Sequence, residues 1–431
     1  MTQTLAQAEN SPPLRRNRTF LAVWAGQAVS DVGSQVSTLA IPLVAVLTLH
    51  ASTFQVGVLR SLAMLAFLLV SLPAGPLVDR WRRRSVLLWC DLLRAAAMTG
   101  LLVALMSDLL AMWQLYTVAF VTGTASVVFG IAFDSYRVGI VPRSRLAEAN
   151  SRFAVTESVS RFAGPGLGAT LVSWAGALAA VLLDALSYLV SFVLLAVWGD
   201  HESDRGPERD ARSRTGPRGL LHEMGEGISF VRSDRVLRRL TAYTAVGNLT
   251  LFAGIAVMLV FMVDTLRMST TTVGLVFMVG EAGGFLSGLL AARLMRVVGS
   301  ARVLWVAAVC APVAFIPVFA TPGNAVVVLS LYMLCSSARF VVYDIAQYTY
   351  RQSVCPPELL GRMTASIRWV VGTSAAVGSL LGGWLGVAAS PRATLAGAAV
   401  VLTAAALLLV LSPLRGARDL DELIGPSPTR P

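Results

Sequence analysis

The sequence predicts an all-α membrane protein with twelve transmembrane helices arranged as two pseudo-symmetric six-helix halves. Of its 431 residues, 55% are hydrophobic and 14% are charged, whereas soluble domains carry about 25% charged residues. The apolar residues fall into long runs, and one bilayer crossing takes about 20 of them. One long polar segment separates the first six runs from the last six. Composition and segmentation together therefore exclude an ordinary soluble domain.

The twelve predicted spans are joined by short connections on either side of this polar segment. Their approximate limits are 19–48, 54–78, 85–107, 112–137, 150–174 and 177–198 in the first half, and 238–264, 272–297, 301–320, 323–350, 360–388 and 391–412 in the second. The two halves are thus predicted to cover residues 19–198 and 238–412.

Three polar segments complete the predicted domain organisation. Residues 1–18 are expected to be a disordered N-terminus. Residues 199–237, rich in Arg, Asp, Glu, Gly and Pro, form a linker between the halves, and residues 413–431 form a tail. A helix on the membrane surface is predicted within the linker from four apolar residues at helical spacing: Leu221, Met224, Ile228 and Val231.

Arginines are distributed unequally between alternate loops. Arginine supplies all 35 basic residues, and the net charge is +11. One set of loops and adjoining span ends contains many arginines: Arg15, Arg16, Arg18, Arg80, Arg82, Arg83, Arg84, Arg143, Arg145, Arg293, Arg296, Arg302, Arg351, Arg362, Arg415 and Arg418. The opposite set has Arg267 and Arg392. Because positive loops stay on the cytoplasmic side, we expect both termini and the linker to be cytoplasmic. The basic excess thus indicates topology in the inner membrane, not nucleic-acid binding.

The two halves repeat at one sequence offset. Five pairs of identical residues are separated by 214 positions: Gly33 and Gly247, Pro142 and Pro356, Leu146 and Leu360, Gly164 and Gly378, and Gly168 and Gly382. A constant offset at such widely spaced points indicates duplicated six-helix halves. Paired halves are a common way to build a transport site with alternating access.

The loop between the second and third spans carries the sharpest local motif. A glycine is followed four residues later by an aspartate and then by a basic run: Gly75, Asp79, Arg80, Arg83 and Arg84. A topology signal alone explains the arginines but not the aspartate. The segment resembles the signature loop of the major facilitator superfamily, although Arg82 stands where that pattern has a second glycine. The resemblance implies a conformational gate in which Asp79 closes the cytoplasmic interface between the halves.

A glycine-proline motif lies in the fifth span, where Gly164, Pro165 and Gly168 occur within five residues. Such a cluster is typical of a kinked, closely packed helix. It also resembles the motif that exporters of this superfamily carry in the same helix, which favours efflux. The equivalent stretch at Gly378 has no proline.

Charges inside the spans are the candidate coupling groups, because a charge at the bilayer centre costs roughly 2.5–3.5 kcal/mol and needs a partner or a role. Some acids have an arginine one helical turn away, which predicts ion pairs: Asp91 with Arg94, Asp134 with Arg137, and Glu157 with Arg161. Others have none within a turn: Asp31, Asp184 and Glu281. Arg60, Arg339 and Arg368 are possible interhelical partners for these. All three histidines fall in loops, so proton transfer is assigned to carboxylates, with Asp31 and Glu281 first.

The resemblance extends over the whole chain and is strongest to bacterial exporters of the macrolide-efflux and enterobactin-export type. It implies a monomeric secondary transporter in the lipid bilayer that exchanges protons for a small amphipathic molecule. An importer or a lipid flippase of the same fold remains the alternative. We expect neither an enzyme nor a cofactor or metal, since the sequence shows no metal spacing and no nucleotide-binding glycine loop. A sensor or scaffold without transport is a further alternative.

Overall fold

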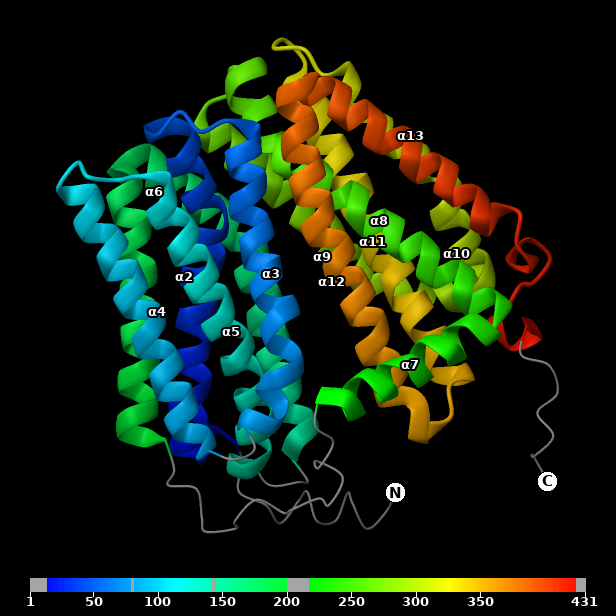
Figure 1. The fold of residues 1–431 in the computed structure, drawn as a ribbon, viewed down its shortest axis with the longest axis horizontal. Helices are drawn as coiled ribbons and strands as arrows, with labels where there is room; N and C mark the ends of the chain where they lie inside the picture. Colours follow the sequence, from blue (N-terminus) through cyan, green and yellow to red (C-terminus); the bar gives the residue numbers. More distant parts are fainter. Residues whose placement is uncertain (1–13, 79–80, 142–144, 200–216, 424–431) are drawn as a thin grey trace. The chain divides into compact units, whose positions relative to one another are not determined.

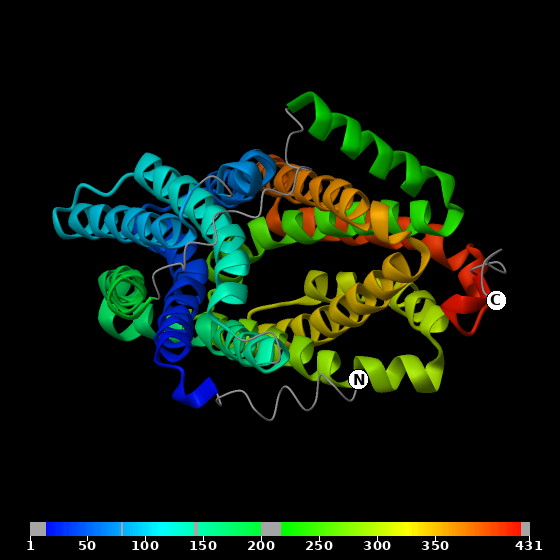
Figure 2. The ribbon, with the colours of Figure 1, turned by 90° about the horizontal axis from the view of Figure 1, so that it is seen from below.

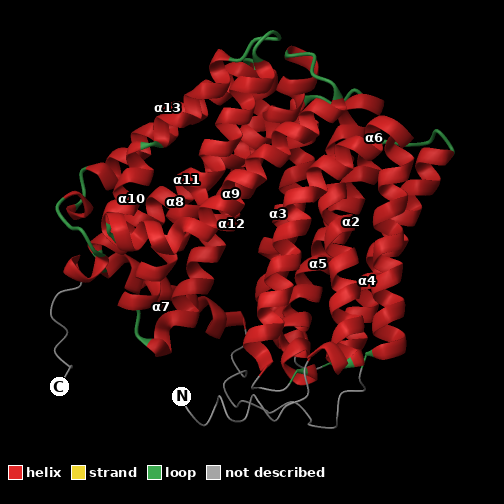
Figure 3. Ribbon diagram, turned by 180° about the vertical axis from the view of Figure 1, so that it is seen from behind, coloured by secondary structure: helices red, strands yellow, loops and turns green. Residues whose placement is uncertain are grey.

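The computed structural model describes residues 14–78, 81–141, 145–199 and 217–423. Throughout these residues the regular structure is helical, with no strand (Figure 3). Eleven helices in the described ranges are long and apolar enough to cross a bilayer. The predicted all-α membrane fold is therefore confirmed.

The helices carry the labels of Figure 1. In chain order they are η1 (Leu14–Arg16), α2 (Arg18–Thr48), α3 (Thr53–Val78), α4 (Arg83–Met106), α5 (Met112–Ile140), α6 (Leu146–Trp198), α7 (Pro217–Ser233), α8 (Arg235–Val260), the π-helix η4 (Phe261–Thr265), α9 (Thr270–Val298), α10 (Ser300–Val309), η5 (Ala311–Phe319), α11 (Ala325–Val354), α12 (Pro357–Ala388), α13 (Pro391–Val410), η6 (Pro413–Arg415) and η7 (Leu420–Leu423).

Helix α6 contains two of the predicted spans, which reverse direction at Gly176. This glycine has a φ of 76°, a conformation that costs residues with a Cβ far more than glycine. The contacts with α2 show this reversal. Along the first arm of α6, the contacted residue of α2 changes from Trp24 (with Thr156) to Val36 (with Gly168). Along the second arm it changes back, from Gly33 (with Ser187) to Gly26 (with Ser191). Counting α6 as two spans gives the predicted twelve.

The sequence repeat reappears in the packing. Gly164 lies against Gln35 of α2, and Gly378, 214 positions later, lies against Leu249 of α8. Gln35 and Leu249 are themselves 214 positions apart. In each case a Cβ on the glycine would come within 2.3 Å of the neighbouring helix, so the missing side chain permits the close crossing. The predicted pseudo-symmetry is thus present in the crossings of α2 with α6 and of α8 with α12.

The structure divides into two compact units. Unit 1 contains the described residues of 1–50 and 62–214, and unit 2 contains those of 51–61 and 215–431. In unit 1, α4 packs against α5 (Figure 2) and both arms of α6 line α2. The first turns of α3 belong to unit 2, where Gly57 lies against Gly383 and Ser61 Oγ donates to the Ala376 carbonyl oxygen at 3.0 Å.

The helix predicted inside the linker is α7, and it belongs to unit 2. It packs along α12, where Glu226 forms an ion pair with Arg362 and Gly227 lies against the Arg362 carbonyl. Val231 is buried in the core of unit 2 while Ile228 is exposed. One part of the predicted apolar face therefore packs against the protein, and another part is exposed. Linker residues 200–216 lie outside the described part of the chain.

The ninth predicted span, 301–320, is interrupted. It consists of the α-helix α10 followed by the 3₁₀-helix η5. Pro312 and Pro317 fall within η5. Proline has no N–H to donate and its ring crowds the preceding turn, which accounts for the change of helix type.

Candidate functional site

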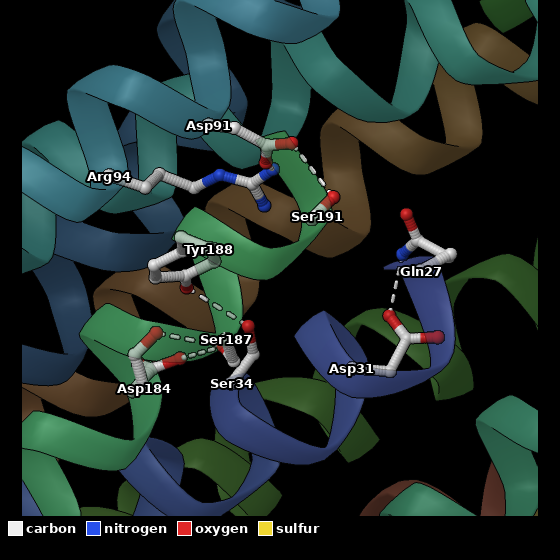
Figure 4. A network of polar contacts seen from close by, with 9 residues as sticks. All are labelled: Gln27, Asp31, Ser34, Asp91, Arg94, Asp184, Ser187, Tyr188 and Ser191. Atoms are coloured by element: carbon white, nitrogen blue, oxygen red, sulfur yellow. Dashed lines mark hydrogen bonds and ion pairs between the residues drawn. The ribbon is translucent and has the colours of Figure 1, made fainter. Parts of the chain in front are cut away.

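A buried ion pair forms the centre of unit 1. Asp91 and Arg94, one turn apart on α4, bind each other and are 0% and 4% exposed. Ser191 of α6 donates its hydroxyl to Asp91 Oδ2 at 2.8 Å (Figure 4). A buried ion pair is tolerated when further hydrogen bonds satisfy its charged atoms. The spacing predicted this pair, but its serine partner comes from another helix.

Two aromatic rings enclose the Arg94 guanidinium. Its Cζ lies 4.3 Å from the ring centroid of Phe129 on α5 and 4.5 Å from that of Tyr188 on α6. Both are within the range of cation–π attraction, which is stronger in a desolvated site. The Tyr188 hydroxyl lies 2.9 Å from Ser34 Oγ on α2. Arg94 therefore links α4, α5 and α6, and Tyr188 extends the network to α2 (Figure 4).

Asp184 lies one turn from Tyr188 on α6 and is 1% exposed. Ser187 Oγ donates to its carboxylate at 3.2 Å. Gly33 of α2 faces this pair so closely that a Cβ there would lie 2.8 Å from Asp184 Oδ1 and 2.2 Å from Ser187 Oγ. The absence of a side chain at Gly33 thus allows α2 to approach a buried acid.

Asp31 lies on α2 at the border of this cluster. Its carboxylate accepts a hydrogen bond from Gln27 Nε2 at 2.7 Å (Figure 4), and the residue is half-buried. Arg94, Arg161 and Glu157 are near enough to act on it electrostatically. Arg94 also acts on Asp184. Arg94 is thus a cation on another helix that acts on both Asp31 and Asp184.

The other predicted ion pairs also form, in more open surroundings. Arg161 binds Glu157 at 2.6 Å on the first arm of α6, with both side chains more than half exposed. Arg137 binds Asp134 at 3.1 Å on α5, where the Asp134 side chain is 69% exposed. Ion pairs in contact with solvent contribute little to stability. Glu157 and Arg161 differ in this respect from the enclosed Asp91 and Arg94.

Glu281 lies in unit 2 and lines a cavity there. This cavity has a volume of about 280 Å³ and is bounded by α8, α9, η5, α11 and α13. Its wall is largely apolar and includes Met258, Phe277, Met333 and Phe340. Polar groups are provided by Tyr243, Asn248, Glu281, Tyr332, Arg339, Asp344 and Gln347. Asp31 and Glu281, which the sequence grouped as one type of residue, thus belong to different units.

Hydrogen bonds fix the polar part of the cavity wall. Arg339 donates to the Tyr243 hydroxyl at 2.9 Å, and Gln347 donates to Asp344 Oδ1 at 2.7 Å. Thr244 donates to Gln347 Oε1 at 3.0 Å. These bonds connect α8 with α11, so the wall offers both cationic and anionic groups in a fixed arrangement.

The structure describes the glycine-proline motif in full and the signature loop only in part. Asp79 and Arg80 lie outside the described residues, and Gly75 lies within α3. Arg83 begins α4, and Arg84 Nη2 donates to the Ala196 carbonyl at 2.6 Å, which ties the start of α4 to the end of α6. In the glycine-proline motif, Cβ atoms at Gly164 and Gly168 would lie 2.3 Å from Gln35 Cβ and 2.7 Å from the Val36 carbonyl oxygen. Pro165 lies between them, inside the helix.

Sequence reasoning found Asp184 but missed the neighbouring side chains that complete the unit 1 cluster. Asp184, Ser187, Tyr188 and Ser191 are spaced as one face of a helix. A polar face in so apolar a span is a detectable signal for a buried site. The partner of this face on α5 left no such signal, since Phe129 is one of many apolar residues in its span.

The sequence profile of the Major Facilitator Superfamily matches residues 23–374, which is most of the chain. The chain belongs to the major facilitator superfamily. It is therefore a multi-pass membrane transporter, and the predicted family resemblance is confirmed.

Among curated relatives, this superfamily member is similar to two bacterial efflux proteins. It is 26% identical over 423 residues to the multidrug efflux pump Tap of Mycobacterium tuberculosis, covering 94% of this chain and 95% of Tap. It is 27% identical over 236 residues to macrolide efflux protein A of Streptococcus pyogenes. That match covers 54% of this chain and spans about half, 55%, of the relative.

Solved structures of other superfamily members share the fold. The nucleoside transporter NupG aligns with a TM-score of 0.67 at 13% identity, covering 91% of this chain and 98% of NupG. A bacterial homologue of the human lysosomal transporter Spinster aligns with a TM-score of 0.68 at 16% identity, covering 93% of this chain and 97% of its own. Identities this low establish the shared fold alone.

Proposed function

We propose that this transporter exports a small amphipathic organic molecule in exchange for protons, with the proton bound in unit 1 and the substrate in unit 2. The observation that carries the proposal is the position of Asp31. Its half-buried carboxylate accepts a hydrogen bond from the neutral side chain of Gln27, while the buried cation Arg94 is paired with Asp91. An acid in such a place is not held permanently as an anion.

The proton step follows from this arrangement. Desolvation disfavours the charged form of a carboxylate, whereas hydration and nearby cations favour it. Gln27 donates a neutral hydrogen bond to Asp31, and Arg94 forms its ion pair with Asp91. Asp31 therefore changes protonation as water enters or leaves its surroundings, and Asp184 is the second candidate for this role. Proton binding on one side of the membrane and release on the other is what antiport requires.

The substrate class follows from the unit 2 cavity. Aromatic rings and methionines provide its apolar wall, while Glu281, Arg339 and Asp344 provide charges. Pockets of this composition bind molecules with an apolar body and a few polar groups. A carboxylate on the wall favours a substrate with a positive group.

The direction of transport and the orientation rest on sequence. Export is supported by the similarity to Tap and to macrolide efflux protein A, whose names state efflux, and by the Gly164–Pro165–Gly168 motif. The arginine-rich loops support cytoplasmic termini in the plasma membrane. We propose a monomer in the lipid bilayer. An importer or a lipid flippase of the same fold is the second candidate.

Inside-out membrane vesicles test this function. A fluorescent amphipathic cation should accumulate inside vesicles that contain the transporter when their interior is acidified, and an ionophore that collapses the pH gradient should abolish the accumulation. Accumulation confined to right-side-out vesicles would identify an importer. Movement of a fluorescent phospholipid between leaflets, without dye accumulation, would identify a flippase.

A further inference from the structure

A second cavity lies on the surface of unit 1, between the beginning of α4 and the middle of α5. We call it the α4–α5 groove, and its volume is about 690 Å³. Its floor consists of small or short side chains that belong to the core of unit 1, including Cys90 and Ala125, which are 7% and 2% exposed. Trp89 and Leu93 form its rim and are 70% and 48% exposed. The groove therefore opens outward from the packed core.

The length of the groove corresponds to one leaflet of a bilayer. It extends along α4 from Arg82, the residue before the helix, to Leu93. At 1.5 Å per residue these eleven steps cover about 16 Å. The hydrocarbon core of a bilayer is about 30 Å thick, so half of it is about 15 Å. An apolar trough of this length fits an acyl chain that lies along the helix.

The groove is charged at one end and mostly apolar along the rest, as a phospholipid is. Arg82 and Trp81 stand exposed at its α4 end, and no described residue forms an ion pair with Arg82. Arginine at this position suits a phosphate, and an exposed tryptophan is typical of the headgroup level. The rest of the lining is apolar apart from Ser85 and Thr124.

We propose that the α4–α5 groove binds one anionic phospholipid, with its phosphate at Arg82 and one acyl chain along α4. Under the proposed orientation this lipid belongs to the cytoplasmic leaflet. The binding itself rests on neither the direction of transport nor the coupling ion. Charge complementarity to Arg82 distinguishes this site from the nonselective contact that any exposed apolar helix makes with lipid.

Native mass spectrometry of the full-length protein in detergent tests the proposal. The probes are dioleoyl phosphatidylglycerol and dioleoyl phosphatidylcholine at equal concentration, and the readout is the ratio of retained lipids. One arginine near the headgroup contributes about 1 kcal/mol, so Arg82→Gln should lower the phosphatidylglycerol preference about fivefold. Ser85→Phe, at an exposed position of the lining, should reduce retention of both lipids. The matched controls are Arg15→Gln and Val103→Phe, which lie outside the groove and should behave as wild type.

A labelling measurement locates the lipid and does not depend on the bulky substitution. A thiol introduced by Ser85→Cys should react with N-ethylmaleimide more slowly when phosphatidylglycerol is added, and Arg82→Gln should remove this protection. An unchanged lipid ratio in Arg82→Gln, or equal labelling with and without phosphatidylglycerol, would overturn the proposal. Equal retention of the two lipids by wild type would do so as well, since it would show apolar contact without headgroup recognition.

Discussion

Gly33 of α2 lies directly against Asp184 of α6, so that a Cβ at position 33 would be 2.8 Å from the Asp184 Oδ1 atom. The same Cβ would be 2.2 Å from Ser187 Oγ, the donor to that carboxylate. A side chain here must displace the serine and break its hydrogen bond.

Gly33→Ala should therefore destabilise the protein and reduce transport. Overpacking of a tight site costs about 1–3 kcal/mol, which should lower the thermal unfolding midpoint in detergent. The repeat provides a matched control, because at Gly247 the nearest atom to an added Cβ is Leu402 Cδ1 at 3.9 Å. Gly247→Ala should be neutral or stabilising by up to about 1 kcal/mol, since alanine favours the helix. Equal midpoints for the two variants would contradict the close approach of α2 to Asp184.

Arg94→Gln should be strongly destabilising, because it leaves the buried Asp91 carboxylate without its cation. Removing one partner of a buried pair costs about 3–5 kcal/mol. The double variant Asp91→Asn/Arg94→Gln should recover part of this loss. The control is Arg137→Gln, which breaks the less buried pair with Asp134 and should cost at most about 1 kcal/mol. Thermal unfolding of all three variants measures these losses of stability. Similar losses of stability for Arg94→Gln and Arg137→Gln would argue against a structural role for the buried Asp91–Arg94 pair.

Glu281→Gln should change substrate preference and leave proton coupling intact, since Glu281 lines the unit 2 cavity and Asp31 lies in unit 1. Loss of one favourable charge contact of about 1 kcal/mol corresponds to an approximately fivefold rise in the half-saturating concentration of a cationic substrate. A neutral analogue should be affected less. The control is Asp264→Asn, an exposed acid that is not part of the cavity lining. Loss of pH-driven transport for both substrates would instead place Glu281 in the coupling machinery.

Asp79→Asn tests the gate implied by the signature loop. If Asp79 closes the cytoplasmic interface between the halves, the variant should insert and express normally but transport poorly. Cysteine probes on the cytoplasmic side should become more accessible, because the outward-facing state loses population. Asp108→Asn, in a loop that the arginine pattern places on the opposite side, serves as the control. Wild-type transport with unchanged labelling would show that the loop acts as a topology signal alone.

The fold was predictable because its determinants are local and repeated. Apolar run length identifies a span, and Gly176 falls between the two predicted spans that α6 contains. The offset of 214 positions anticipated the matching crossings at Gly164 and Gly378. The change to a 3₁₀-helix after α10 was not predicted, although Pro312 and Pro317 were visible.

The candidate site was predictable only in part, because only some of its contacts are local in the sequence. Partners within one helix follow from spacing, so the Asp91–Arg94 pair was found. Partners on other helices depend on how α4, α5 and α6 pack, and periodicity carries no information about the neighbour of a given face. Phe129, Tyr188 and Ser191 were missed for this reason.

The most direct test of the account is the transport of protons through Asp31. Wild type and Asp31→Asn should be compared in proteoliposomes for two activities, pH-gradient-driven accumulation of a substrate and its downhill exchange. Because asparagine cannot take up and release a proton, Asp31→Asn should lose the driven accumulation and retain downhill exchange. Concentration of substrate by Asp31→Asn to the wild-type level would contradict the account and would move the coupling role to Asp184 or Glu157.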